Sequence, residues 1–591
     1  MLRCFARKCS GPGCRCRQLE NKSRLLSHLV GWTLAAMPLS SLPALAQVVP
    51  DAGSLQRQLR EGVPEFRPEQ QRPPTPQAPV QPREQGPRVL VRGFILNGAS
   101  LIPEAELQSL LRDQVGQELN LGDLQRLTLT ISDAYRQRGF FARVYLPAQD
   151  ASEGVIRIQI VEGRFGTVIR QPGSGRADGD FVAAVAAARL RSGAPYSIDM
   201  LERGLLLAND LPGVAVDGIL KAGQETGTSD LVLEIRDTPL LTVFANGDNG
   251  GSRASGRYRG TASLLLNGPA GYGDSLSLQG LASEGLTYGQ IGLDFPLGVD
   301  GLRAGLSLTG LDYDLVGDFK ALDAEGTAVT QRVDLSYPVL RSDRHTVHIR
   351  AAYEHSRYND DALGDALHRK RLDKGNATLE GNRTDAWGGG GLTRYSFTMT
   401  AGRLNLSRLA ADAAFDAATA RTDGPFAKLS GELQRDQAIG QALFLRAVLA
   451  GQWSRTNLDS SEQFSLGGPA GVRAYPVNEA SGDSGLLTNL ELHYPVAAGW
   501  AQGLDLFGFL DAGLVRRHAD PWAGWNARSN DTNSYPLFGA GIGASYVMGN
   551  GLGFRLTAAA PFGANKGAPS GFNQDGSKSD PRVWFSTSMQ F

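Results

Sequence analysis

Apolar and polar positions alternate along the C-terminal part of the chain, from residue 239 to residue 591. In segment 395–401 (YSFTMTA), for example, every second residue is apolar. About sixteen such segments, close to the ~10-residue alternating pattern of outer-membrane strands, are separated by turns of Gly, Asn and Asp; they lie near positions 240, 257, 274, 287, 302, 329, 345, 374, 393, 425, 441, 485, 503, 537, 552 and 583. A soluble sandwich shows the same alternation in any one strand, so the number of segments decides. We predict a transmembrane β-barrel of about 16 antiparallel strands over 239–591, with an aqueous lumen.

Residues 88–238 change to helical and strand periods in a repeating order, β-α-α-β-β. The first unit has strands at 89–97, 141–146 and 155–161 and helices at 103–113 and 122–138. The second has strands at 166–170, 214–220 and 230–236 and helices at 179–191 and 198–210. The pattern predicts two similar α/β modules, 88–163 and 164–238, whose sheet edges can accept a strand from an extended peptide.

The first 46 residues are typical of a secretory signal peptide. Seven basic residues and one acidic residue precede an apolar segment, which ends at Ala44-Leu45-Ala46. All four cysteines (Cys4, Cys9, Cys14 and Cys16) lie in this leader. Removing it would change the formal net charge from −1 to −7. Because the basic region is unusually long, the true start codon could lie downstream of Met1. We expect an exported, thiol-free chain of a bacterial envelope.

A short helix and a spacer follow the leader. Leu55 and Leu59 share one face of a helix within 47–61, which is too short to be stable alone and needs a surface to dock on. Residues 62–87 are rich in Pro, Gln, Glu and Arg and predict an extended, semi-rigid linker. One interpretation is a plug-like helix tethered to reach the barrel lumen, and the other is a disordered tail.

Composition and motifs argue against several other classes. A near-zero net charge does not favour nucleic acid binding, and a glycine content of 73 residues with 20 % charged residues is not that of a disordered chain. Gly273-Asp274-Ser275-Leu276 and Gly482-Asp483-Ser484-Gly485 mimic hydrolase segments but lack a nucleophile elbow and a partner histidine. His345 and His348 lie on a strand, where positions three apart face opposite sides. We predict no catalytic site, no metal site and no cofactor.

A long Gly-rich segment, 455–482, interrupts the barrel strands and carries Val472, Arg473 and Tyr475. These residues would be exposed for no evident reason in an ordinary surface loop, which favours a loop folded into the lumen. In strand 503–515 the alternation places Asp511 and Gly513 on the inward face, where Asp511 could accept hydrogen bonds from Arg473. The alternative is an unrelated surface arginine and a lumen aspartate.

Three groups of residues resemble those of a known family, the outer-membrane transporters of two-partner secretion (the haemolysin-activator and filamentous-haemagglutinin transporters). The first module resembles that family's POTRA signature, the loop resembles its VRG[YF] motif, and the later strand resembles its [FG]xDxG motif. The last strand ends the chain on Phe591, similar to the C-terminal assembly signal of bacterial outer-membrane barrels. The matching residues are Tyr135, Gly139, Phe140, Pro147, Gln149, Glu162 and Gly163; Gly468, Val472, Arg473, Ala474 and Tyr475; and Phe509, Asp511 and Gly513.

One position departs from the family pattern. Ala474 stands where the family's motif usually has glycine, and glycine alone adopts positive φ freely. We therefore expect the tip of the loop to adopt a somewhat different turn.

The resemblance implies a pore in the bacterial outer membrane with its POTRA modules in the periplasm. Such a pore captures an unfolded, exported partner protein that carries an N-terminal secretion domain, and secretes it. Its other partners would be outer-membrane lipid, lipopolysaccharide and the machinery that assembles barrels, and it would act as a monomer. The rival interpretations are an insertase that assembles other barrels, a passive porin and an outer-membrane enzyme. The identity of the secreted partner is not in the sequence.

Overall fold

The computed structural model describes residues 49–62, 88–172, 175–440, 442–496, 499–526, 532–568, 571–578 and 580–591. The predicted leader, and residues 63–87 of the predicted linker, lie outside this part of the chain. None of the described helices is long and apolar enough to cross a membrane.

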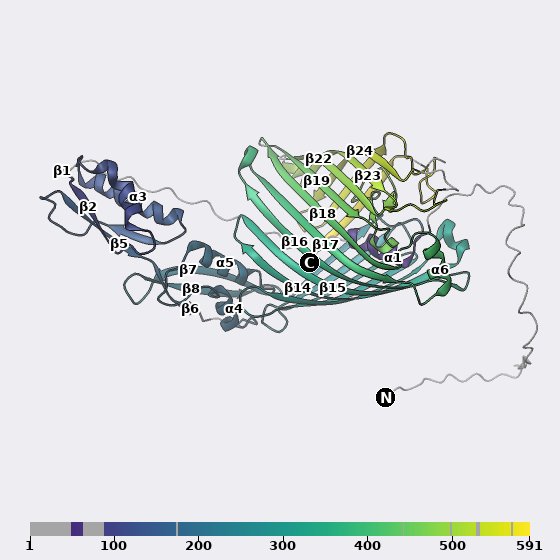
Figure 1. Ribbon diagram of the computed structural model, residues 1–591, viewed down its shortest axis with the longest axis horizontal. Helices are drawn as coiled ribbons and strands as arrows, with labels where there is room; N and C mark the ends of the chain where they lie inside the picture. Colours follow the sequence, from purple (N-terminus) through teal and green to yellow (C-terminus); the bar gives the residue numbers. More distant parts are fainter. Residues whose placement is uncertain are drawn as a thin grey trace, which may run out of the picture. The chain divides into compact units, whose positions relative to one another are not determined.

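Sixteen antiparallel strands close into a barrel, which confirms the predicted fold class (Figure 1). Each barrel strand pairs with the next barrel strand along the chain, and the last, β26, closes on the first, β9. The strands are β9 (Leu241–Asp248), β10 (Arg259–Asn267), β11 (Ser275–Ser283), β12 (Leu286–Pro296), β13 (Arg303–Asp314), β14 (Ala324–Arg341), β15 (His345–Ala362), β16 (Asp365–Asp385), β17 (Gly391–Asn405), β18 (Gly424–Ile439), β19 (Leu443–Ser454), β22 (Ser484–Pro495), β23 (Leu504–Arg516), β24 (Ser534–Val547), β25 (Gly553–Pro561) and β26 (Arg582–Gln590).

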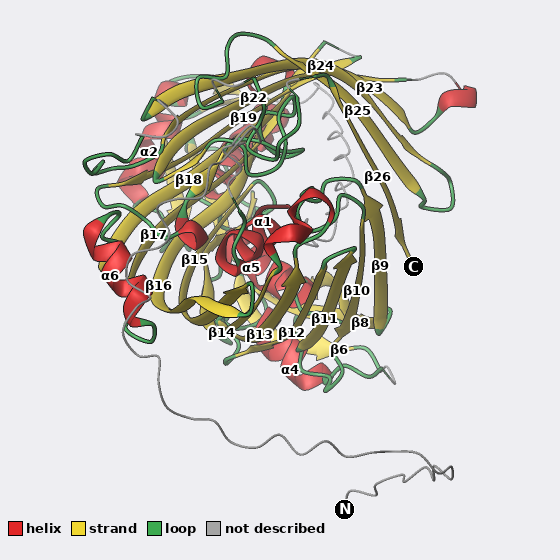
Figure 2. Cartoon of the chain, turned by 90° about the vertical axis from the view of Figure 1, so that its right-hand side faces the viewer, coloured by secondary structure: helices red, strands yellow, loops and turns green. Residues whose placement is uncertain are grey.

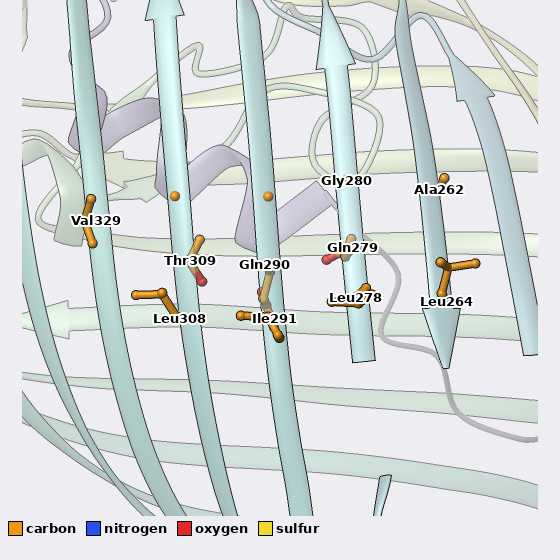
Figure 3. Close-up of a pocket in the computed structure, with 12 residues that line it drawn as sticks. Ala262, Leu264, Leu278, Gln279, Gly280, Gln290, Ile291, Leu308, Thr309 and Val329 are labelled. Atoms are coloured by element: carbon orange, nitrogen blue, oxygen red, sulfur yellow. The ribbon is translucent and has the colours of Figure 1, made fainter. Parts of the chain in front are cut away.

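The alternation in sequence becomes an apolar outer face and a polar inner face. Figure 3 shows part of the wall, where apolar side chains of neighbouring strands form a shallow hollow on one side and Gln279, Gln290 and Thr309 extend to the other. The apolar side chains there are Leu264, Leu278, Ile291, Leu308 and Val329, and all five are exposed. Because lipid favours such a surface, this band is the membrane-facing side of the barrel.

The first α/β module has the expected order of elements. It consists of β2 (Gly93–Asn97), α2 (Glu104–Leu111), α3 (Leu121–Gln137), β4 (Ala142–Tyr145) and β5 (Val155–Glu162). Its sheet has the order β2-β5-β4, with β2 parallel and β4 antiparallel to β5. The expected strand 89–97 is divided, because the Arg92 N–H donates to the Gly154 carbonyl and β1 (Val89–Leu90) pairs instead with β3 (Glu118–Leu119). A 3-10 turn, η1 (Arg112–Gln114), follows α2.

The second module repeats this design. It contains β6 (Arg164–Arg170), α4 (Gly179–Ala186), α5 (Ile198–Asn209), β7 (Val214–Ala222) and β8 (Thr228–Asp237), with sheet order β6-β8-β7. The helix expected at 179–191 ends at Ala186, since the following residues form tight turns in which the Leu190 N–H donates to the Ala187 carbonyl. Each module encloses its own apolar core between helices and sheet.

Two further apolar clusters lie inside the barrel. One surrounds α1 (Ala52–Gly62), which Figure 2 shows within the ring of strands. The other surrounds the segment between β19 and β22, which includes η4 (Ser460–Glu462), β20 (Phe464–Ser465) and β21 (Ser481–Gly482). The remaining short helices are η2 (Gly317–Leu322), η3 (Trp387–Gly389), α6 (Ala410–Ala418) and η5 (Gly499–Ala501).

Candidate functional site: the plug and the in-folded loop

The segment between β19 and β22 folds back into the barrel. β20 and β21 pair antiparallel and bring its two ends together. Val472 and Tyr475, which the sequence placed in this loop, are both buried and pack with Leu466, Phe507 and Phe509. The loop therefore has an apolar core of its own, formed jointly with the inner face of the barrel wall.

Glycines permit the tight path of this loop. Gly468 has φ +117°, a conformation that other residues rarely adopt. A side chain at Gly471 would lie 1.9 Å from the Leu466 carbonyl oxygen. These close approaches explain why the loop is rich in glycine.

Arg473 and Asp511 form a bidentate ion pair inside the barrel. Arg473 Nε donates to Asp511 Oδ2 at 2.9 Å and Arg473 Nη2 donates to Asp511 Oδ1 at 2.6 Å. The backbone N–H of Arg473 also donates to Oδ2, at 3.0 Å. Both residues are buried, with 4 % and 1 % of their surface exposed, so the pair replaces hydration that each charge has lost.

Further groups, which the sequence motifs do not include, complete this site. Arg473 Nη1 also donates to Glu491, and Asn489 Nδ2 donates to Asp511 Oδ1 at 2.7 Å and to the Gly471 carbonyl at 2.9 Å. Trp584 Nε1 donates to the Arg473 carbonyl at 2.7 Å. The inward alternation of β22 and β26 contains the signal for these residues, but no motif marks them.

The aromatic residue and the small residue of the strand motif, Phe509 and Gly513, make different contacts with the loop. The guanidinium of Arg473 lies 3.5 Å from the ring centroid of Phe509, a cation–π arrangement. Gly513 leaves room for the loop, because a side chain there would lie 2.6 Å from Leu466.

Ala474 does not occupy a left-handed conformation. The non-glycine residues with positive φ in the described chain include Asn478 and Ala480 of the same loop but not Ala474. Its methyl group instead faces Gly539, where an added side chain would lie 2.9 Å away. At this position the backbone does not require glycine, and the extra methyl group is accommodated by a glycine of the wall.

Helix α1 lies between this loop and the barrel wall. Ala52, Leu55 and Leu59 are buried in the first lumen cluster. Its polar residues bond on other sides: Gln56 Nε2 donates to Thr330 Oγ1 at 3.0 Å, and Arg57 Nη2 donates to Asn478 Oδ1 at 3.2 Å. The predicted need for a docking surface is thus met by strands on one side and by the in-folded loop on the other.

Buried charges hold the start of α1 and the loop together. Lys370 Nζ of β16 donates to Asp51 at 2.7 Å and to Asp459 at 2.8 Å, so one cation links the helix N-terminus to the loop. Beside it, Glu462 accepts hydrogen bonds from Lys374 Nζ and lies 2.9 Å from Lys428 Nζ. Each of these buried lysines near α1 is therefore paired with at least one carboxylate of α1 or the loop.

The POTRA-like residues of the first module centre on Glu162. Its carboxylate accepts hydrogen bonds from the N–H groups of Ser100 and Leu101, both at 2.7 Å, and from Tyr135 Oη at 2.8 Å. Burial opposes ionisation of Glu162, but these hydrogen bonds outweigh it and lower its pKa. Burial together with the adjacent carboxylate raises the pKa of Tyr135. This buried carboxylate fixes the loop after β2 against α3.

The other residues of that signature shape turns. Gly139 has φ +78° and its carbonyl accepts from the Ile198 N–H at 2.7 Å, while Phe140 forms a bridge with Ser197 of the second module. Gln149 extends the sheet, because its side-chain amide exchanges two hydrogen bonds with the Arg157 backbone. Pro147 lies two residues before it, in the segment between β4 and β5. The N–H of Gly163 donates to the Phe141 carbonyl at 2.8 Å.

Phe591 takes part in closing the barrel. Its N–H donates to the Val243 carbonyl at 2.9 Å and its carbonyl accepts from the Val243 N–H at 3.2 Å, while its ring is exposed. Among the residues that the structure describes, no cluster of His, Cys, Asp and Glu is arranged to hold a metal ion.

Comparisons with known proteins agree with this architecture. A family described as haemolysin secretion/activation protein ShlB/FhaC/HecB matches residues 227–546, and a POTRA domain of the ShlB type matches residues 89–163. The chain is 27 % identical over 544 residues to the heme/hemopexin transporter protein HuxB of Haemophilus influenzae strain 86-028NP, covering 89 % of this chain and 93 % of the relative. It is 25 % identical over 507 residues to the outer membrane transporter CdiB of Escherichia coli, covering 82 % and 81 %.

Solved structures share the fold. CdiB from Escherichia coli superposes with a TM-score of 0.67 at 21 % identity, over 88 % of this chain and 93 % of that one. BamA from Haemophilus ducreyi lacking POTRA domains 1–3 gives a TM-score of 0.50 at 13 % identity, over 85 % of this chain and all of the other.

Proposed function

Because the chain belongs to the ShlB/FhaC/HecB family of haemolysin secretion and activation proteins, an outer-membrane family with periplasmic POTRA domains, we propose how its parts divide the work of secretion. The POTRA modules capture an unfolded partner chain by strand addition, and the barrel conducts it once α1 leaves the lumen. The observation that carries the proposal is a pore filled by a short, mostly polar helix beside modules with open sheet edges. Export needs no nucleotide, since the partner folds outside and cannot return.

The edge of β7 is the best candidate for strand addition. The edge of β6 is covered, because Phe165 exchanges backbone hydrogen bonds with Gly193 and Ala194. β4 has four residues and β2 has five, one of whose carbonyls accepts from Gln108. β7 has nine residues. At its outer edge the Val214 N–H donates to the Leu211 carbonyl and the Asn209 side chain bonds at Val216, and no further backbone bond of the described chain occupies that edge from Gly218 to Ala222.

The pairing at Val216 identifies which residues of β7 point outward. The N–H and carbonyl of Val216 both bond to Asn209, away from β8, so Gly218, Leu220 and Ala222 share that direction in an antiparallel strand. An incoming strand would pair with these residues. Ile219, which is 55 % exposed, adds an apolar contact beside them.

Two variants of one residue test this capture. Leu220→Pro removes an outward N–H without removing a bond to β8, whereas Leu220→Ala removes the same side chain and keeps the N–H. We expect Leu220→Pro to reduce secretion of a co-expressed partner into the medium severalfold and Leu220→Ala to leave it close to the unsubstituted level.

Deletion of 88–237 removes both modules and therefore shows the largest loss of secretion that failed capture can cause. The barrel's heat-dependent mobility on gels shows that it still folds in this variant. Undiminished secretion after this deletion would refute capture by the modules. Equal effects of the two Leu220 variants would refute strand addition at β7.

Other partners follow from the surfaces. The exposed apolar band contacts outer-membrane lipid and, in the outer leaflet, lipopolysaccharide. Phe591 and the apolar face of β26 would be the signal that the barrel-assembly machinery reads. We propose that the partner is a large exported protein. Two relatives are named as a heme/hemopexin transporter and as the outer membrane transporter CdiB, and we expect this chain to secrete a protein as those transporters do.

A further inference from the structure

A basic cavity lies on the extracellular side of the seam where the barrel closes. It has a volume of about 270 Å³ and is lined by three segments: the loop after β9, the loop before β26, and Pro476 and Val477 of the in-folded loop. The second module leads into β9 from the periplasmic side, so the far end of β9 and the start of β26 are extracellular.

Four cations and two carboxylates line this cavity. The cations are Arg253, Arg257, Lys578 and Arg582, and the carboxylates are Asp575 and Asp580. The lining therefore carries a net positive charge, although the whole chain is nearly neutral. Such an excess of positive charge attracts an anion, because the lining has fewer carboxylates than cations to pair with them.

The carboxylates of the lining neutralise its cations only in part. Asp575 accepts from the Ser577 N–H within its own turn at 2.9 Å, and its nearest approach to Arg582 is 4.0 Å. Arg253 pairs at 2.6 Å with Asp318, an exposed residue of another loop.

The remaining cations have capacity for a ligand. Arg582 is largely buried, yet its Nε has no hydrogen-bond partner in the described chain. Arg257 and Lys578 are exposed and form no ion pair with any described residue.

The seam beneath the cavity is the shortest pairing in the barrel. β26 and β9 share five residue pairs, from Ser586–Asp248 to Gln590–Phe244, whereas β15 and β16 share eighteen. Asn249 extends the seam with its side chain, accepting from the Phe585 N–H at 2.8 Å and donating to the Val583 carbonyl at 2.9 Å. A ligand held from both sides would therefore strengthen the shortest junction of the closed sheet.

We propose that this cavity binds a phosphate-bearing anion, which bridges the first and last hairpins of the barrel. Arg257 belongs to the β9 side of the seam, and Lys578 and Arg582 belong to the β26 side. A phosphate group offers several acceptor oxygens, so it can bond arginines from both sides at once. Two sources supply this chemistry at the cell surface: the phosphorylated headgroup of lipid A and free phosphoanions.

The experiment uses the full chain purified in detergent, with two probes. Bisphosphorylated lipid A and inorganic pyrophosphate are titrated separately, and binding is followed by native mass spectrometry and by the unfolding temperature. The test variant is Arg257→Gln/Lys578→Gln, since neither side chain pairs within the described chain and folding should be preserved. The matched control is Arg408→Gln, an exposed arginine of another extracellular loop that forms no ion pair with a residue the structure describes.

We expect the double variant to weaken binding about tenfold or more, as the loss of two charge-assisted contacts implies, and the control to bind as the unsubstituted chain does. Binding of lipid A alone identifies the headgroup as the source, whereas binding of both probes shows that the phosphate group suffices. Fully dephosphorylated lipid A should not bind in either case. The proposal is overturned if neither probe binds, or if the double variant and the control bind equally.

Discussion

Arg473 shows how single residues hold the in-folded loop to the wall. Its charge is buried against Asp511 and Glu491. Asp511 also accepts a hydrogen bond from Asn489, and Glu491 lies 3.5 Å from Arg555. A charge removed from water is stabilised only while its partners remain, so loss of one partner is more harmful than loss of both.

Substitution of this pair gives a prediction at the residue scale. Arg473→Ala leaves Asp511 buried without its cation and should cost the docked loop about 3–5 kcal/mol, whereas Arg473→Ala/Asp511→Ala should cost less than the sum of the single changes. Hydrogen exchange in peptides from 466–482 measures the opening free energy of the loop in each variant. Secretion should fall in the single variant while the unheated protein still migrates as a folded barrel.

Arg408→Ala, an exposed arginine in a neighbouring loop, controls for loss of a positive charge. If hydrogen exchange and secretion in Arg473→Ala equal those of the unsubstituted chain, the pair does not hold the loop. Additive effects in the double variant would show that the two residues act separately.

The limits of sequence reasoning are visible at this same site. Alternation along β23 predicted that Asp511 faces inward, and the structure places it against Arg473. Asn489 and Glu491 are equally inward on β22, but polar inward residues are common in an aqueous lumen, so nothing in the sequence distinguished them. Only the three-dimensional register, which sets Asn489 opposite Asp511, brings them together.

Helix α1 shows how an element can be unstable alone and fixed in context. Eleven residues cannot sustain a helix in water, so its conformation depends on the lumen around it. The spacing of Leu55 and Leu59 predicted that a docking surface exists. The partners of Gln56 and Arg57 could not be predicted, because they lie hundreds of residues away on β14 and in the in-folded loop.

A charge placed on the apolar face of α1 should open the pore. Leu55→Glu would bury an unpaired carboxylate in the lumen cluster, which costs several kcal/mol, about as much as so short a helix gains by docking. We expect a higher mean single-channel conductance in planar bilayers than for the unsubstituted chain.

Leu110→Glu makes the same chemical change at an exposed position of α2, and its conductance should not change. A Leu55→Glu channel with unaltered conductance would show that α1 does not limit the pore.

At the scale of the whole molecule, two bidentate arginines are among the contacts that bind the second module to the rim of the barrel, beside Arg203 and Arg176. Arg341 of β14 donates to Asp210 through Nε at 2.7 Å and through Nη2 at 2.8 Å. Arg189 donates to Asp300 through Nε and through Nη2, both at 3.0 Å. Tyr337 Oη donates to Asp300 as well, at 2.7 Å. Despite the cost of its burial, these bonds lower the pKa of Asp300.

Sequence patterns predicted the module and the barrel but not this junction. Arg189 and Asp210 lie on turns, where charged residues are common on any solvated surface. Arg341, at the end of β14, has the sequence context of an ordinary residue at the membrane interface. Their pairing depends on the angle at which the module meets the rim, which local periodicity does not encode. The consequence is that the edge of β7 has a defined orientation relative to the mouth of the pore.

Removing both arginines should free the module from that orientation. Arg189→Gln/Arg341→Gln deletes the cations and leaves Asp210 and Asp300, each about 40 % exposed, able to hydrate. Charge-assisted bonds of this kind contribute about 1.5–3 kcal/mol each, so their loss should populate undocked arrangements. Spin labels at Met200→Cys on α5 and Leu297→Cys on the rim report this as a broader distance distribution, and both sites are exposed. The chain after residue 16 contains no other cysteine that could be labelled.

Arg236→Gln is the matched control, because Arg236 pairs with Asp217 inside the same module and does not reach the rim. Its distance distribution should equal that of the labelled parent. If the double variant also keeps the parent's narrow distribution, then the other contacts of the junction hold it and the two arginines are dispensable. These contacts include Arg203 with Asp300, Arg176 with the Gly268 carbonyl, and Val299 with the module's core. If the distribution broadens and secretion falls with it, the fixed angle between capture edge and pore is a working part of export.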